Sequence, residues 1–259
     1  MPHCVVLHDA IRTGDITKVR QAFRRTSNKD ITDKNGNTAF WIASEMGYLN
    51  IIRFLVNKGC ATEQVNLNGW TPLHAASAAG HHTIVKYLLD HHNNPGEKSL
   101  NGSTPLMLAC RQGHSKCVQM LLDASYNLDE EDNEGLSAVH HAAIGGHLAV
   151  ITILEETDED VIAINGRGHT PIVCAIQHGH TELVRYICSK VDVRTIEVFE
   201  PLGLGKNLLE VAKGCRYPEI VHMLTDQTDT KQINPSKAAS LKVNHICNAL
   251  LKMVNGWQT

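Results

Sequence analysis

The stretch from Asn68 to His81 reads Asn-Gly-Trp-Thr-Pro-Leu-His-Ala-Ala-Ser-Ala-Ala-Gly-His, and it decides the fold. Its Asn-Gly pair predicts a tight turn, because glycine adopts positive φ without a steric penalty and asparagine tolerates it. Thr71 then stands at a helix N-cap, where its hydroxyl can accept a backbone N–H. Pro72 follows at the first helical position, where a missing N–H costs nothing. Gly80 predicts the end of this short, alanine-rich helix.

The same pattern recurs at a fixed distance along the chain. The capping position is repeated every 33 residues, at Thr38, Thr71, Thr104, Ser137 and Thr170. The glycine that ends the first helix keeps the same spacing, at Gly47, Gly80, Gly113, Gly146 and Gly179. A second helix follows each copy, with apolar residues three apart on one face. A period of this length indicates stacked supersecondary units, each of which buries its apolar face against its neighbours.

The best copies of the motif are Thr71-Pro72-Leu73-His74-Ala75-Ala76 and Thr104-Pro105-Leu106-Met107-Leu108-Ala109. On these residues the chain resembles the ankyrin repeat family, over about residues 5–224. The resemblance implies an all-α repeat solenoid of stacked helix-turn-helix ankyrin repeats with β-hairpin-like finger turns. It also implies that the first helices line a concave face. We expect a repeat domain at 1–224 with seven units, of which the first and last are degenerate caps.

Three departures from the repeat carry further expectations. Trp41 replaces the motif histidine; its ring either packs against the next helix or forms an aromatic anchor near the groove. The small residue that should match Ala175 is Ala212 rather than Leu208, so four residues are inserted before the last repeat. Residues 225–259 predict a polar linker and an amphipathic helix at 236–254. That helix either packs on the last repeat or docks on a partner.

Composition limits the class of protein. The chain has 259 residues, a formal net charge of −3 and eight cysteines without a C-x-x-C pair. The charge gives no global attraction to nucleic acid, and no run of 18 apolar residues predicts a membrane span. The N-terminus lacks the basic and apolar segments of a secretory signal. We therefore expect an intracellular protein, cytoplasmic or nuclear, with buried cysteines in a reducing compartment.

No motif for catalysis is present. Most of the sixteen histidines follow the repeat, and the adjacent pairs are not combined with cysteines at zinc-finger spacing. The chain has neither a G-x-S-x-G nucleophile elbow nor a complete phosphate-binding P-loop. We therefore expect a protein that is not an enzyme and that has no metal site and no cofactor.

Repeat scaffolds bind through the positions that the fold leaves free. In this register one row precedes the capping threonine or serine, and two rows precede the glycine that ends the first helix. Tryptophan and arginine, which lie in these rows, often dominate protein interfaces. Trp70 and Leu136 have an alternative interpretation, in which they pack finger against finger. The predicted partner-binding residues are Met46, Trp70, Arg111, Gln112, Leu136, Ile144, His169, Gln177 and His178.

The window from Asp129 to Asp160 contains ten acidic residues and no lysine or arginine. Because its two acidic loops are one period apart, stacking should bring them side by side. They form either a solvated edge or a patch for a basic segment of a partner, whose attraction would fade with salt. The predicted acidic patch is Asp129, Glu130, Glu131, Glu155, Glu156, Asp158, Glu159 and Asp160.

These observations predict a monomeric, non-enzymatic interaction module or scaffold. It would bind a protein segment, including a basic one, along the concave groove and the finger turns, without nucleic acid and without membrane insertion. A first alternative is the substrate-recognition arm of a larger assembly such as a ubiquitin-ligase adaptor. A second is a sensor of a small ligand or nucleotide that Trp70 and Arg111 would stack against and clamp.

Overall fold

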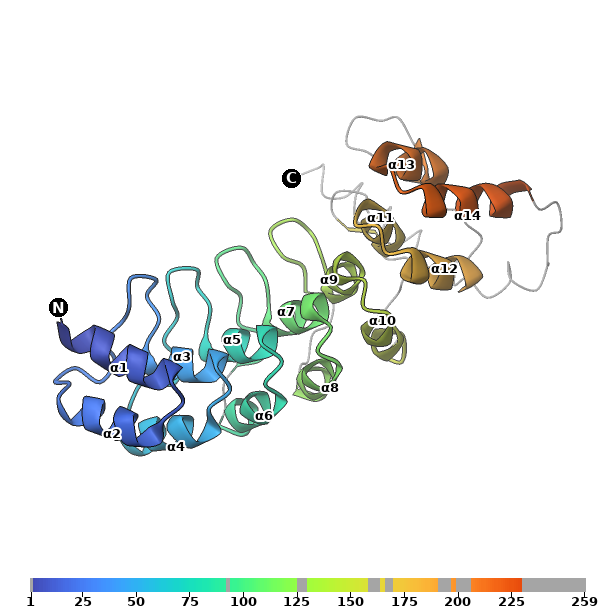
Figure 1. Cartoon of the computed structure of the whole chain (residues 1–259). Coiled ribbons are helices and arrows are strands. Elements are labelled where there is room, and N and C mark those ends of the chain that lie inside the picture. The colour runs from blue at the N-terminus through green and yellow to red at the C-terminus, as the bar shows by residue number, and fades with distance from the viewer. Residues whose placement is uncertain are drawn as a thin grey trace, which may run out of the picture. The chain divides into compact units, whose positions relative to one another are not determined.

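The computed structural model describes residues 2–91, 94–124, 130–157, 164–165, 170–190, 197–198 and 206–229 (Figure 1). The chain divides into two compact units, Met1–Asn133 and Glu134–Thr259. Seven helix pairs occur among the described residues, as many as the predicted repeats. The predicted all-α fold class is confirmed.

The first unit contains four helix pairs. The first helices of its repeats pack side by side in the order α1, α3, α5, α7, and α2 packs on α4 and α6 on α8. Leu7, Ile52 and Leu88 are among the apolar side chains buried between these layers. The pairs are α1 (Pro2–Arg12) with α2 (Ile16–Arg24), α3 (Ala39–Glu45) with α4 (Leu49–Asn57), α5 (Pro72–Ala78) with α6 (His82–Asp90), and α7 (Pro105–Gln112) with α8 (Ser115–Ala124).

The second unit contains three helix pairs built in the same way. Here α11 packs on both α9 and α13, and α12 packs on both α10 and α14. A short antiparallel pair of strands, β1 (Glu197–Val198) and β2 (Lys206–Asn207), precedes the last helix pair. The pairs are α9 (Ala138–Gly145) with α10 (Leu148–Glu155), α11 (Pro171–Gln177) with α12 (Thr181–Lys190), and α13 (Leu208–Cys215) with α14 (Pro218–Asp229).

The motif residues connect the start of the first helix of a repeat to the finger turn of the next repeat. The Thr71 hydroxyl accepts a hydrogen bond from the backbone N–H of His74 at 3.3 Å, and the His74 Nδ1 accepts one from the backbone N–H of Thr71 at 3.2 Å. Because Nδ1 is the acceptor, the proton lies on Nε2, which donates to the carbonyl oxygen of Ser103 at 3.0 Å. Burial lowers the pKa of His74 to about 4, so the ring is neutral at pH 7.

Trp41 occupies the position of the motif histidine and makes the same kind of hydrogen bond with a different ring. Its side chain is buried, and its indole Nε1 donates to the carbonyl oxygen of Trp70 at 3.0 Å. This bond links the first helix of one repeat to the next finger, as His74 does one repeat later. The prediction that Trp41 packs into the scaffold is confirmed, and its role as a groove anchor is not.

Glycines at the ends of the first helices allow adjacent repeats to approach closely. Gly80 has φ +76°, and a Cβ placed there would lie 2.6 Å from the His114 ring. That ring is held by a 3.1 Å contact between its Nε2 and the carbonyl oxygen of Ala78. In the second unit the ring of Tyr217 covers Gly179 in the same way. Tyr217 follows His180 by 37 residues, four more than the repeat, which confirms the predicted insertion.

The last described repeat replaces the threonine cap by Asn207. Its side chain accepts from the backbone N–H of Glu210 at 2.9 Å, and the Glu210 carboxylate accepts from the backbone N–H of Asn207 at 3.2 Å. Helix α14 continues to Asp229, so the expected linker does not begin at residue 225. That expectation was wrong, because the helix continues through the polar residues that follow the buried Leu224. The predicted helix at 236–254 lies outside the described residues.

Candidate functional site: a protein-binding surface on the repeats

The finger turns of the first unit form a rigid row. Each finger closes on itself through a backbone bond, from Asn66 N–H to the Trp70 carbonyl at 3.1 Å in the second finger. Each finger also bonds to the one before it, from Leu67 N–H to the Asn35 carbonyl and from Leu100 N–H to the Asn68 carbonyl, both at 3.0 Å. The β-hairpin-like fingers that the family resemblance implied are therefore present (Figure 1).

The ends of the first helices carry the predicted binding row. Met46 follows the last residue of α3, and its side chain is 38% exposed. Arg111 and Gln112 lie in the last turn of α7 and are exposed. Between them, Ala78 and the adjacent Ala79 end α5 and are half-buried. The first unit therefore places Met46 and Gln112 at equivalent positions two repeats apart, with Arg111 next to Gln112 and with the small side chains of Ala78 and Ala79 on the repeat between them.

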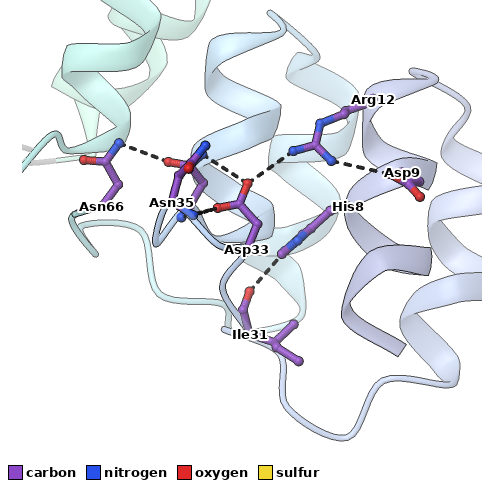
Figure 2. Close-up of polar contacts among 8 residues, drawn as sticks. His8, Asp9, Arg12, Ile31, Asp33, Asn35 and Asn66 are labelled. Carbon is purple, nitrogen blue, oxygen red and sulfur yellow. Dashed lines mark hydrogen bonds and ion pairs between the residues drawn. The ribbon is translucent and has the colours of Figure 1, made fainter. Parts of the chain in front are cut away.

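The same row begins one repeat earlier, at Arg12. This residue lies 33 positions before Glu45 and was missed in the sequence, where the first repeat lacks the threonine-proline motif. The Arg12 guanidinium lies 3.2 Å from the Asp33 carboxylate of the first finger and 3.4 Å from that of Asp9 (Figure 2). Arg12 still has a side chain that is 46% exposed, so it remains accessible at the end of the row.

Asp33 is the centre of the polar network that fixes Arg12 (Figure 2). Its carboxylate accepts from the backbone N–H groups of Asn35 at 2.9 Å and Asn37 at 3.0 Å, and from the Asn37 side chain at 3.1 Å. Burial alone would raise the pKa of Asp33, but these hydrogen bonds outweigh it and lower the pKa. The Asn66 side chain continues the network, because its amide donates to Asn37 Oδ1 at 3.0 Å.

Glu45 places an acid in the same row. It lies in the last turn of α3 and is half-buried. Burial raises the pKa of Glu45, Arg12 lowers it, and Asp33 raises it, with a net increase. Along the first unit the row therefore reads Arg12, Glu45, Ala78 and Arg111: basic, acidic, small and basic. This charge sequence is the most specific feature of the surface.

The residues that directly precede the helix-capping residues are more buried than predicted. Asn37 and Ser103 are buried, and so is Leu136, which is only 8% exposed. The prediction of an exposed Leu136 was therefore wrong. In a hairpin-like finger alternate residues point inward, and Asn37 shows that this position does so. Trp70 is half-buried, and its ring stacks on that of His74 with centroids 6.4 Å apart.

The second unit presents three of the predicted residues at its surface. Ile144 is half-buried at the end of α9, and Gln177 and His178 are exposed at the end of α11. His178 is held in place, because its Nδ1 contacts the Cys174 carbonyl at 2.9 Å and its ring stacks on that of His180. His169 lies outside the described residues.

Two residues of the predicted acidic patch, Glu130 and Glu155, form ion pairs with lysines. Lys98 forms an ion pair with Glu130 and donates to the backbone carbonyl of Glu131 at 2.9 Å. Glu155 lies 3.1 Å from Lys190 and accepts from the Tyr186 hydroxyl at 2.5 Å. Both lysines come from outside the window, so its negative charge is partly neutralised. Glu156 is exposed. Asp129, Asp158, Glu159 and Asp160 lie outside the described residues.

Two exposed leucines at the finger ends were not predicted as binding residues. Leu67 is 68% exposed and Leu100 is 73% exposed, and both lie in the first unit. Val65, on the same finger as Leu67, is 45% exposed. A signal was present in the sequence, because the two leucines are 33 residues apart, between Lys34 and Asn133 at the equivalent places.

Within the described ranges, no cluster of three or more His, Cys, Asp or Glu side chains could hold a metal ion. Six cysteines are free thiols: Cys60, Cys110, Cys117, Cys174, Cys188 and Cys215. Burial raises the pKa of Cys60, Cys117 and Cys188 to about 11 and that of Cys174 to about 12. Thiols with such pKa values are poor nucleophiles at neutral pH. Every helix in the described part of the chain is too short or too polar to cross a bilayer.

Comparison with protein families agrees with this geometry. Residues 7–99 and 91–165 match the family model of ankyrin repeats in three copies, and residues 167–196 match that of a single ankyrin repeat. These matches cover more than half of the chain, which belongs to the ankyrin repeat family. Members of this family generally mediate protein–protein interactions and are typically not enzymes. The chain matches none of the curated proteins.

Proposed function

We propose that the chain is a non-enzymatic protein-binding module. The first unit would hold a partner segment along the row Arg12, Glu45, Ala78 and Arg111, with Met46 and Gln112 beside it. The observation that carries the proposal is the 38% exposed Met46 beside a row of charged and small residues. The neighbouring motif positions are buried in the scaffold, as His74 and Thr71 are. The row is therefore where the sequence can vary without disturbing the repeat.

The chemistry of the row describes the partner. Ala78 and Ala79 have small side chains, so a side chain of the partner has room between Met46 and Arg111. Met46 offers a flexible apolar surface that adapts to different apolar side chains. Arg12 and Arg111 favour carboxylates, because guanidinium groups form charge-assisted hydrogen bonds with them. We therefore infer a segment with an apolar residue between acidic ones, whose binding weakens as salt increases.

The proposal also includes other residues that the sequence predicted as partner-binding. In the second unit Ile144, Gln177 and His178 would form the corresponding surface, and Trp70 would contribute its exposed edge. Monomeric state and an intracellular location also remain part of the proposal. The buried free thiols support such a location, because disulfides are rare in a reducing compartment.

The proposal is tested by capture of partners on the full chain, followed by mass spectrometry. The variant Met46→Ser with Arg111→Ser should keep its helicity and lose the captured partner. The matched control is Lys86→Ser with Asp123→Ser, which changes two exposed residues of the second helices α6 and α8. Equal capture by both variants would mean that the partner binds a different face.

The two alternative functions remain predictions with their own tests. A recognition arm that uses 236–254 predicts fast amide exchange of this segment alone and slow exchange with a partner. A ligand sensor predicts that a metabolite raises the melting temperature, and that Trp70→Ala removes the effect. A screen of metabolites without such an effect would argue against the sensor.

A further inference from the structure

The ends of the second and third fingers carry an apolar ridge that the fold does not require. It consists of Val65, Leu67 and Leu100, which are 45%, 68% and 73% exposed. Between Val65 and Leu67, Asn66 points inward, is buried and bonds to Asn37. This alternation puts Val65 and Leu67 on one side of the finger. Exposed apolar side chains that lie together on neighbouring elements mark interaction sites.

The ridge is held rigidly. The backbone N–H groups of both leucines are bonded to the preceding finger at 3.0 Å, to Asn35 and to Asn68. The Leu67 and Leu100 side chains lie close to Gly36 and Gly69, each the positive-φ glycine of the preceding finger. Because the backbone of both leucines is already fixed, binding of a partner costs less conformational entropy than it would on a flexible loop. The ridge is therefore preorganised for binding.

Charges of opposite sign flank the ridge. Lys34 occupies the equivalent place on the first finger and is exposed. On the far side lie Glu130, Glu131 and Asp132, with Lys98 as the basic partner of Glu130. That end therefore carries more acidic than basic side chains, with Glu131 at the place equivalent to Val65. At the places equivalent to the leucines, the finger ends of this unit read Lys34, Leu67, Leu100 and Asn133: basic, apolar, apolar and polar.

We propose that this ridge binds an extended segment of a partner protein with two apolar residues three positions apart. The segment would carry an acidic residue on the Lys34 side and a basic residue on the Glu131 side. Neighbouring helices pack at about 8–10 Å, which sets the separation of the leucines on consecutive repeats. In a polyproline II conformation, residues three apart lie on the same side and about 9 Å apart. The proposal rests on the proposed function as a protein-binding module and adds a second contact surface with its own chemistry.

The test uses a phage-displayed library of random 16-residue peptides against the full chain. Peptides are selected on the wild type and then tested for binding to the ridge variant Leu67→Ser with Leu100→Ser. The selected peptides should carry apolar pairs three apart, flanked by one acidic and one basic residue. Their synthetic versions should bind the ridge variant at least tenfold more weakly, and Lys34→Glu should also weaken them. The control variant Val6→Ser, which removes an exposed apolar side chain of α1, should bind normally.

The groove variant Met46→Ser with Arg111→Ser separates this proposal from the proposed function. Peptides that depend on the ridge but not on the groove support the ridge, whatever the groove binds. Peptides that depend only on the groove, or that bind the ridge variant equally well, overturn the ridge proposal. Apolar pairs seven apart would contradict an extended segment, because that spacing belongs to a helix. A wild-type dimer in sedimentation that the ridge variant abolishes would assign the ridge to self-association instead.

Discussion

The indole Nε1 of Trp41 donates a hydrogen bond to the backbone carbonyl oxygen of Trp70 across 3.0 Å. One repeat later, the Nε2 of His74 makes the same kind of contact with the Ser103 carbonyl. The two rings differ in size and chemistry, yet each donates one N–H to a backbone carbonyl of the next finger. The motif position therefore belongs to the scaffold, and variation in it says little about the partner.

The first prediction concerns this bond. Trp41→Phe keeps an aromatic ring but removes one of the two donors to the Trp70 carbonyl, which still accepts from the Asn66 backbone N–H. Loss of one such hydrogen bond costs about 0.5–1.5 kcal/mol, and the smaller ring adds a packing loss. Urea unfolding followed by circular dichroism should show this decrease in the free energy of unfolding. An unchanged midpoint would mean that the bond has no role in stability.

The second prediction concerns a pair of glycines with opposite roles. Gly80→Ala should destabilise the protein, because its φ is +76° and the new Cβ would lie 2.6 Å from the His114 ring. The backbone strain alone costs about 1–2 kcal/mol. Gly214→Ala should stabilise α13 by about 0.5–1 kcal/mol, because nothing lies within 4 Å of the new Cβ. Changes of the same sign in thermal unfolding would contradict this account of the repeat contacts.

The third prediction concerns pH. The pKa of His74 is lowered from 6.5 to about 4 in the folded state. Between these two pH values the His74 ring is therefore protonated in the unfolded chain and neutral in the folded chain. The stability from neutral His74 is therefore complete above pH 6.5 and is lost as the pH falls from 6.5 to about 4. At pH 4.5 this loss amounts to about 2–3 kcal/mol relative to pH 7.

Urea unfolding at pH 7 and pH 4.5 measures that loss. His74→Gln should reduce the difference between the two pH values by most of this amount, because other titrating groups remain in both proteins. His91→Gln changes an exposed histidine of the same unit and serves as the control. If both variants keep the wild-type difference, His74 does not titrate as described.

The fourth prediction compares two serines at equivalent positions. Ser44 and Ser77 are buried, and the Ser44 hydroxyl donates to the Phe40 carbonyl at 2.9 Å. Among the described residues, no partner lies within bonding distance of the Ser77 hydroxyl. Ser44→Ala should therefore cost about 1 kcal/mol, whereas Ser77→Ala should be neutral or stabilising. Chemical denaturation of both variants gives the comparison, and an equal loss in the two would show that Ser77 has a partner after all.

The sequence predicts the scaffold well because each scaffold residue acts locally. The threonine cap, the proline and the glycine of positive φ each impose a backbone conformation on neighbouring residues, and the period repeats that effect. Even the four-residue insertion is visible from the position of Ala212, because the buried small residue is a local requirement.

The surface is predicted less well because exposure depends on contacts between repeats. Leu136 is apolar and occupies a predicted row, yet the finger buries it. Leu67 and Leu100 are equally apolar, and the finger exposes them. The lysines that neutralise Glu130 and Glu155 come from about one repeat away, so a local charge count misses them. Arg12 was missed because its repeat lacks the motif that sets the register.

The central claim, that the first unit binds partners through the ends of its first helices, is tested most directly by photocrosslinking. A benzophenone amino acid replaces Met46 in one full-length protein and Lys86 on α6 in another, and both are irradiated with the partner identified by capture. We expect a crosslinked product from position 46 and none from position 86, with the adduct reduced at high salt. Crosslinking from position 86 without crosslinking from position 46 would contradict the account.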